Sequence, residues 1–185
     1  PMTDALVVPG MRLAVRGLKA LAENRADSAS AEGMALGALW GGIALANAGL
    51  GAVHGLAAPL GGQYPVPHGA ACACLLPHSI AANYQALRQR APESTALARY
   101  EDVAVTVAGI GASPERAAAS LEKLRRTLGI PPLASFGVAP EGLASVIRGS
   151  RAGSMRGNPI ELTDEELAGI LTRALASPDE GAVGA

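Results

Sequence analysis

The sequence predicts an all-α protein, and composition and patterning both support that class. Alanine and glycine together make up about a third of the 185 residues, whereas aromatic residues make up 3%. This composition favours closely packed helices over a β-sandwich, which is rich in aromatic and β-branched residues. No segment shows the apolar–polar alternation of a half-buried strand. Apolar residues instead recur at helical spacing between glycines and prolines that end helices.

Two long helices are expected in the N-terminal part of the chain. Residues 4–23 carry apolar side chains mostly at helical spacing, although Pro9-Gly10 should kink or interrupt this helix. Residues 31–48 form a long apolar helix. Its glycines fall four residues apart, at Gly33, Gly37 and Gly41. They form a bare ridge, and we expect another helix of the chain to pack closely against it.

Two shorter helices follow, separated by a reversal of the chain. The helix over 51–60 is expected to end at Gly61-Gly62, because prolines follow and prevent its continuation. Pro67 suits the start of the next helix, which should cover residues 68–76 and could resume after Pro77.

The remaining helices are amphipathic and carry clear start signals. We expect them over residues 100–110, 114–128, 140–148 and 163–175. Ser113 is the expected N-cap before Pro114, and the segment Thr163-Asp-Glu-Glu is a capping box. The basic side chains of the second of these helices should form a solvated face; they are Lys123, Arg125 and Arg126.

Charge and cysteine content exclude several classes of protein. The chain has 15 Lys and Arg against 16 Asp and Glu, so it lacks the basic excess of a nucleic-acid binder. Two cysteines exclude a disulfide scaffold, and no basic-then-apolar leader precedes the first helix. We therefore expect a cytoplasmic protein, with one helical domain over residues 1–176 and a flexible tail over 177–185.

Residues 33–87 contain no Asp, Glu, Lys or Arg. Such a block is either buried on every side or lies in lipid, and residues 34–53 are about long enough to span a bilayer. That stretch contains many glycines and Asn47, and no Lys/Arg cluster flanks it as a topology signal. We therefore favour a buried helical core over membrane insertion.

His54 and His68 are the candidate metal ligands. One straight helix would hold them roughly 21 Å apart, which is too far for one ion. The segment Gly61-Gly-Gln-Tyr-Pro-Val-Pro67 could reverse the chain and bring them together. His68 also begins a helix, whose dipole favours the neutral imidazole that binds metal. From spacing alone, two hydrogen-bonded core histidines remain the alternative.

The other candidate residues have structural interpretations. His78 should point away from the histidine pair and hydrogen-bond a backbone carbonyl. Cys72 and Cys74 lie two residues apart on a helix and face nearly opposite sides, so they cannot share a metal. We interpret both cysteines as small buried residues.

The longest motifs resemble the signature of iron-containing alcohol dehydrogenases. They are Ala46-Asn-Ala-Gly-Leu-Gly-Ala-Val-His54, Pro67-His68-Gly69 and Leu75-Leu-Pro-His78, with Ser154-Met-Arg-Gly-Asn158-Pro159 later in the chain. The resemblance covers nearly the whole sequence. It implies the C-terminal helical domain of a fold shared with dehydroquinate synthase, in which an N-terminal α/β domain binds a nucleotide.

The resemblance also implies a site. In the family one Asp and three His hold a catalytic iron or zinc ion, and two of those histidines match His54 and His68. The other two ligands would lie upstream of Pro1, as would the nucleotide-binding domain. Ala58 stands where the family usually has a histidine in the proton path, and Ser154 matches a position near the substrate pocket.

The implied reaction is hydride transfer between NAD or NADP and a small alcohol or aldehyde. The chain alone offers two neutral imidazoles and no nucleotide-binding half, so we expect it to bind divalent metal weakly and to be inactive. The alternative is a non-catalytic helical interaction module descended from that domain. In either case we expect an uncovered apolar patch and a homo-oligomer, or a longer polypeptide.

Overall fold

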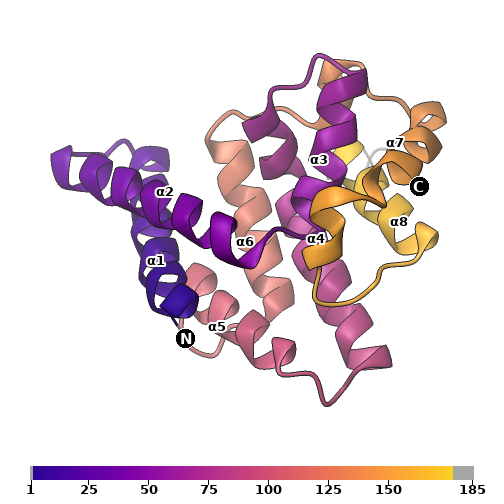
Figure 1. The fold of residues 1–185 in the computed structure, drawn as a ribbon. Coiled ribbons are helices and arrows are strands. Elements are labelled where there is room, and N and C mark those ends of the chain that lie inside the picture. The colour runs from indigo at the N-terminus through magenta and orange to yellow at the C-terminus, as the bar shows by residue number, and fades with distance from the viewer. Residues whose placement is uncertain (1, 177–185) are drawn as a thin grey trace, which may run out of the picture.

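The computed structural model describes residues 2–176, and every regular element in that range is a helix (Figure 1). The α-helices are α1 (Met2–Ala22), α2 (Ser28–Ala48), α3 (Ala52–Gln63), α4 (His68–Arg90), α5 (Ala96–Ala108), α6 (Pro114–Thr127), α7 (Leu143–Ser150) and α8 (Asp164–Leu175). Short 3-10 helices are η1 (Leu133–Phe136), η2 (Pro140–Gly142) and η3 (Gly153–Gly157). The all-α prediction is confirmed, and the expected tail over 177–185 lies outside the described residues.

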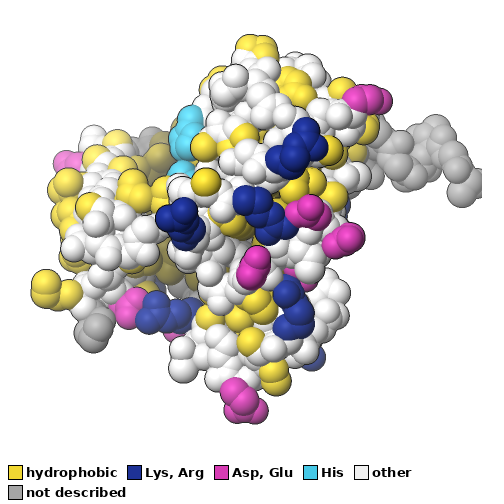
Figure 2. Space-filling view, turned by 45° about the vertical axis from the view of Figure 1, so that its right-hand side comes forward, with side chains coloured by type: hydrophobic (Ala, Val, Ile, Leu, Met, Phe, Trp, Pro, Cys, Tyr) yellow, Lys and Arg dark blue, Asp and Glu magenta, His cyan; other side chains and the backbone are white. Residues whose placement is uncertain are grey.

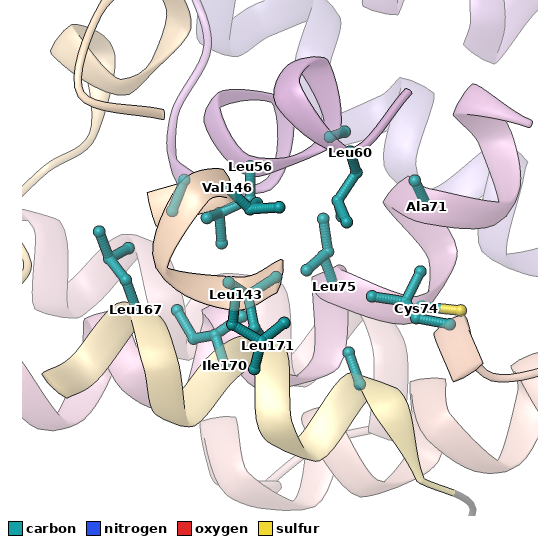
Figure 3. Close-up of a cluster of buried hydrophobic side chains, with 14 of the residues drawn as sticks. Leu56, Leu60, Ala71, Cys74, Leu75, Leu143, Val146, Leu167, Ile170 and Leu171 are labelled. Atoms are coloured by element: carbon teal, nitrogen blue, oxygen red, sulfur yellow. The ribbon is translucent and has the colours of Figure 1, made fainter. Parts of the chain in front are cut away.

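The main core lies where α3, α4, α7 and α8 meet (Figure 3). Leu60 from α3, Leu75 from α4 and Leu171 from α8 are fully buried in it. Each such side chain stabilises the fold by about 1.5–3 kcal/mol relative to an exposed one. The charge-free sequence of α3, and of α4 up to Leu87, therefore forms the centre of the protein, as predicted.

The same prediction is wrong for α2. This helix packs mainly along α1, and together they project from the rest of the molecule (Figure 1). Ala44 is its only buried residue, whereas Leu39 and Ile43 are 60% and 42% exposed. Among the helices of residues 2–176, α2 alone is long and apolar enough to cross a membrane by length and composition. α2 carries apolar residues on every face, and its one main neighbour, α1, covers only one of those faces.

The glycine ridge of α2 faces α1 along part of its length. A Cβ on Gly37 would lie 2.9 Å from the carbonyl oxygen of Gly10, and one on Gly33 would lie 3.3 Å from Leu13. A Cβ on Gly41 would meet no atom within 4 Å. The expected close packing is thus confirmed at Gly33 and Gly37 and is wrong at Gly41.

Several helices continue past residues that were expected to end, kink or interrupt them. α1 runs through Pro9, α4 runs through Pro77, and α3 continues through Gly61-Gly62 to Gln63. A proline inside a helix costs about 3 kcal/mol. In α4 the packing against α3, α6 and α8 offsets that cost, because Pro77 is itself buried.

The predicted solvated face of α6 is wrong at one position. Arg125 is buried, and its guanidinium donates two hydrogen bonds to the Glu122 carboxylate at 3.0 and 2.6 Å. It also donates to the carbonyl oxygen of Ile130, just after the helix. Pairing with Glu122 and the carbonyl is what makes burial of this charge possible.

Candidate metal centre

His54 and His68 lie side by side at the junction of two helices. His54 is in the first turn of α3 and His68 is the first residue of α4. The connection from Tyr64 to Pro67 reverses the chain between these helices. The two imidazole centroids are 5.3 Å apart, with the ring planes inclined at 48°. The predicted chain reversal therefore brings the two side chains together.

Cys72 joins the pair, which the sequence interpretation missed. Its Sγ lies 3.5 Å from Nε2 of His68, one helical turn earlier on α4. The potential ligand atoms of His54, His68 and Cys72 all lie within 4.8 Å of one another. The signal was present in the sequence, because residues four apart on a helix share a face.

The electrostatics of the cluster favour neutral groups in the absence of a metal. Burial, and secondarily the neighbouring His68, lower the pKa of His54. Burial raises the pKa of the Cys72 thiol. A neutral imidazole is the form that coordinates metal, whereas a thiol must lose its proton to do so.

His54 and Cys72 line a pocket of about 490 Å³ between the start of α3, the middle of α4 and the segment after η3. Leu76 and Ile80 contribute apolar wall, while Ser79 contributes a polar group. The Ser79 hydroxyl oxygen is buried and has no hydrogen-bond partner among residues 2–176. Buried hydroxyls are normally paired, so this oxygen is available to a bound molecule or water.

Figure 2 shows histidine side chains at the molecular surface, in the hollow between the projecting α1–α2 pair and the main body. Of the two clustered histidines, His68 is exposed and His54 is half-buried. The cluster is therefore accessible from solvent at one side and faces the pocket at the other.

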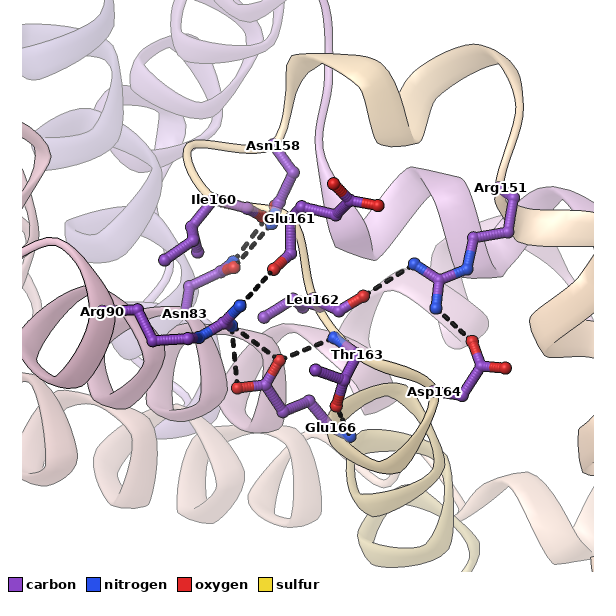
Figure 4. Close-up of polar contacts among 10 residues, drawn as sticks. All are labelled: Asn83, Arg90, Arg151, Asn158, Ile160, Glu161, Leu162, Thr163, Asp164 and Glu166. Atoms are coloured by element: carbon purple, nitrogen blue, oxygen red, sulfur yellow. Dashed lines mark hydrogen bonds and ion pairs between the residues drawn. The ribbon is translucent and has the colours of Figure 1, made fainter.

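Asn158 positions the start of α3 relative to the other walls (Figure 4). Its Oδ1 accepts a hydrogen bond of 3.0 Å from the backbone N–H of Ala52. It also exchanges two side-chain hydrogen bonds with Asn83 of α4, at 3.2 and 2.6 Å. Gly51 permits this approach, because a Cβ there would lie 2.8 Å from Asn158 Oδ1. The network links both histidine-bearing helices to the segment after η3.

A second network in Figure 4 fixes α8. The predicted capping box is present, with the Thr163 hydroxyl accepting from the backbone N–H of Glu166 and the Glu166 carboxylate accepting from that of Thr163. Arg90, at the end of α4, donates to both carboxylate oxygens of Glu166 at 2.9 and 2.8 Å. Arg151 pairs with Asp164 in the first turn of α8.

The other predicted residues are not among the potential ligands of the cluster. Ser154 is half-buried on η3 and is not part of the pocket lining, to which the same segment contributes Gly157 and Asn158. His78 is not part of the cluster, and the charged groups that influence its pKa are Glu122 and Arg125 of α6 and Arg173 of α8. The expected hydrogen bond from His78 to a carbonyl is not present among residues 2–176. Ala58, one turn after His54 on α3, is exposed.

The two cysteines face different surroundings, as expected from their spacing. Cys74 is buried in the core and its thiol donates to the carbonyl oxygen of Pro131 at 3.3 Å. Cys72 is only half-buried, and its neighbours are the two histidines. Cys72 also packs against the edge of the main core, so the predicted packing role holds in part, although its thiol is not fully buried.

The structure thus defines an all-helical domain with a histidine–cysteine cluster at the edge of a pocket. A family model described as "Fe-containing alcohol dehydrogenase family, C-terminal" matches residues 1–175, and the chain belongs to that family.

Two related proteins align in sequence with most of this chain. Lactaldehyde reductase of Escherichia coli K12 is 34% identical over 174 residues, which are 90% of this chain and 43% of the relative. 1,3-Propanediol dehydrogenase of Klebsiella pneumoniae is 33% identical over 177 residues, or 94% and 45% of the two chains. This chain therefore spans less than half the length of these relatives.

Solved structures also superpose on most of this chain, and this chain covers less than half of each of them. The crystal structure of a 1,3-propanediol oxidoreductase superposes with a TM-score of 0.78 at 32% identity, covering 94% of this chain and 45% of that one. An alcohol dehydrogenase from Oenococcus oeni superposes with a TM-score of 0.78 at 29% identity, covering 94% and 45%.

Proposed function

We propose that this chain is the metal-site domain of a nicotinamide-dependent alcohol dehydrogenase that interconverts a small alcohol and the corresponding aldehyde. The observation that carries the proposal is the convergence of His54 and His68 beside the pocket, with ring centroids 5.3 Å apart. Two imidazoles at this separation suit one divalent ion, iron or zinc, after small side-chain rotations. Relatives named for lactaldehyde and propanediol support a small hydroxylated substrate.

Each part of the chain would contribute a defined task. A bound divalent ion supplies Lewis acidity that polarises the alcohol oxygen. His54 and His68 would hold that ion, and Leu76 and Ile80 would exclude water from the apolar part of the substrate. The hydride acceptor, NAD or NADP, would be held by a separate nucleotide-binding domain. Ala58 has no ionisable group, so the alcohol proton must leave by another route, such as a water at the exposed face.

The remaining parts of the proposal concern the isolated chain and its surroundings. We propose that the 185 residues alone do not oxidise alcohols, because the nicotinamide-binding part is not among them. We also propose cytoplasmic location and self-association through α2, with neither nucleic acid nor a membrane as partner. A non-catalytic interaction module is the second candidate function, and the exposed apolar face of α2 favours it.

The test compares the natural gene product with the 185-residue chain. Intact mass establishes the length of the natural product, and NAD or NADP reduction is then measured with primary alcohols and propanediols after loading with iron or zinc. We expect activity in the natural product, none in the isolated chain, and loss of activity in His54→Ala and His68→Ala. His78→Gln is the matched control, since this third histidine lies outside the cluster. Full activity in His54→Ala, or no activity in a metal-loaded natural product, would overturn the proposal.

A further inference from the structure

We infer that a second pocket, where α1, α5 and α6 pack together, binds the phosphate group of a small anionic molecule (Figure 1). This basic pocket has a volume of about 460 Å³, which lies within the range of ordinary small-molecule sites. It shares no lining residue with the pocket beside the histidines. The inference is therefore independent of the proposed function and of any metal ion.

Positive charge dominates the lining of the basic pocket. Lys19 of α1 and both Arg116 and Lys123 of α6 line it, and Glu23 is the one acidic residue among the described lining residues. The Glu23 carboxylate accepts hydrogen bonds from the guanidinium of Arg25, which offsets its charge. Lys19 and Lys123 are the only lysines in the sequence, and both line this pocket. Such a concentration of cations, in a chain of net charge −1, attracts an anion locally.

The end of α5 holds the ammonium group of Lys19 in place. Its Nζ donates a hydrogen bond of 2.7 Å to the carbonyl oxygen of Val107, in the last turn of α5. An ammonium has three donors, so two remain for a ligand. The contact also covers a carbonyl at the negative end of the α5 dipole, which would otherwise repel an anion.

One polar face of α6 forms the opposite wall. Arg116, Ser120, Lys123 and Thr127 follow one another at spacings of four, three and four residues, so they share a face of the helix. Neither Arg116 nor Lys123 has an ion-pair partner among residues 2–176. Arg116 lies in the first turn of α6, where the helix dipole favours acidic side chains over basic ones. The wall therefore presents two uncompensated cations that a bound anion would stabilise.

The donors in the basic pocket suit a phosphate group. A guanidinium binds phosphate oxygens in a bidentate manner, and lysine ammonium groups add point charges. A phosphate carries close to two negative charges and three strong acceptor oxygens, so it can accept from Lys19, Arg116 and Lys123 together. Val107, Ala108 and Leu124 add apolar wall, which suits a short organic group attached to the phosphate. Inorganic phosphate offers the same acceptor oxygens without that group.

Isothermal titration calorimetry of the 185-residue chain, treated with a chelator and desalted, tests the inference without a metal ion at the histidines. The probes are phenyl phosphate, inorganic phosphate and phenol. We expect saturable binding of phenyl phosphate and none of phenol. Tighter binding of phenyl phosphate than of inorganic phosphate would support a phosphorylated organic ligand, whereas equal binding would support the free anion. No saturable binding of either phosphate, or equal binding of phenol and phenyl phosphate, overturns the inference.

Charge-removing variants locate the binding site. Arg116→Gln and Lys123→Gln should each weaken the binding of phenyl phosphate about tenfold, because each removes a charged hydrogen-bond donor. Arg148→Gln is the matched control, since Arg148 is exposed on α7 and does not line the basic pocket. The control should bind as the wild-type chain does. Equal weakening in all three variants would indicate attraction to overall charge and would contradict the site.

Lysine acetylation of the wild-type chain gives a second measurement, which needs no variant to fold. Phenyl phosphate should slow the modification of Lys19 and Lys123 by an amine-reactive acetylating reagent, followed by mass spectrometry of the peptides. The N-terminal amine of the same chain is the internal control and should react at an unchanged rate. Acetylation of both lysines at the same rate with and without phenyl phosphate contradicts the inference.

Discussion

The side chain of Asn158 both caps the start of α3 and contacts α4. It accepts from the first backbone N–H of α3 and pairs with the buried Asn83 of α4. Replacement by alanine leaves those groups unpaired, and each buried unpaired group costs about 1–3 kcal/mol. We expect Asn158→Ala to lower the free energy of unfolding by about 2 kcal/mol, measured by urea denaturation. Asn47→Ala is the control, since Asn47 is exposed on α2; equal effects of the two changes would contradict this role.

His78 should make stability depend on pH. Burial lowers its pKa from the ordinary value of 6.5, with Arg173 and Arg125 acting in the same direction and Glu122 opposing them. The unfolded chain therefore takes up a proton before the folded chain does, and the folded state loses stability as pH falls below about 6.5. We expect the free energy of unfolding to fall between about pH 7.5 and pH 5.

The variant His78→Gln isolates this contribution. It should show a weaker fall in stability over the same pH range, although not a flat profile, because the pKa of His54 is also lowered. Denaturant titrations at several pH values provide the measurement. An unchanged pH dependence in His78→Gln would show that other groups cause it.

At the scale of elements, the contact between α1 and α2 depends on a glycine. A Cβ at Gly37 would lie 2.9 Å from the backbone oxygen of Gly10, and backbone cannot move aside as a side chain can. We expect Gly37→Ala to destabilise the α1–α2 pair by about 1–3 kcal/mol.

Gly41 provides a matched comparison one turn further along α2. A Cβ there meets no atom within 4 Å, so Gly41→Ala should instead stabilise α2 by up to about 1 kcal/mol through helix propensity. Hydrogen exchange of the α1 and α2 amides reports both effects. Equal protection in the two variants would show that the helices do not pack as described.

For the molecule as a whole, the exposed face of α2 is the feature that should govern association. Leu36, Leu39 and Ile43 lie on one face of this helix and are all exposed. Contiguous apolar surface of this kind normally contacts another protein surface. We expect the chain to self-associate at micromolar concentration, observed by sedimentation velocity.

Charge placed on that face should disrupt the association. The double variant Leu39→Glu with Ile43→Glu is expected to sediment as a monomer with unchanged helicity. Gly61→Glu, at another exposed helical position, is the control. A wild-type chain that remains a monomer and does not bind a hydrophobic dye contradicts the prediction. A chain that partitions into lipid vesicles through α2 would favour membrane contact instead.

Local signals in the sequence were sufficient to predict that the helices exist and where α6 and α8 begin, whereas α5 begins at Ala96, four residues before the predicted start. Ser113 and Thr163 cap α6 and α8 as expected, because an N-cap hydrogen bond involves residues only three apart. The helix end predicted at Gly61-Gly62 is wrong, and α4 runs through Pro77. The free-energy cost of a glycine or proline in a helix can be read from the local sequence. The packing that offsets this cost in α4 involves other helices and cannot.

The sequence by itself determined the fold class, the charge-free centre and the chain reversal between His54 and His68. Only the tertiary structure decided which apolar and charged side chains are buried: α2 is exposed although it carries no charge from Gly33 onward, and Arg125 is buried although it is charged. It also decided that the ligand atoms of Cys72 and the two histidines converge. The physical reason is the same in each case. Periodicity tells which residues share a face of one helix, whereas burial and ligand distances depend on which other element that face meets.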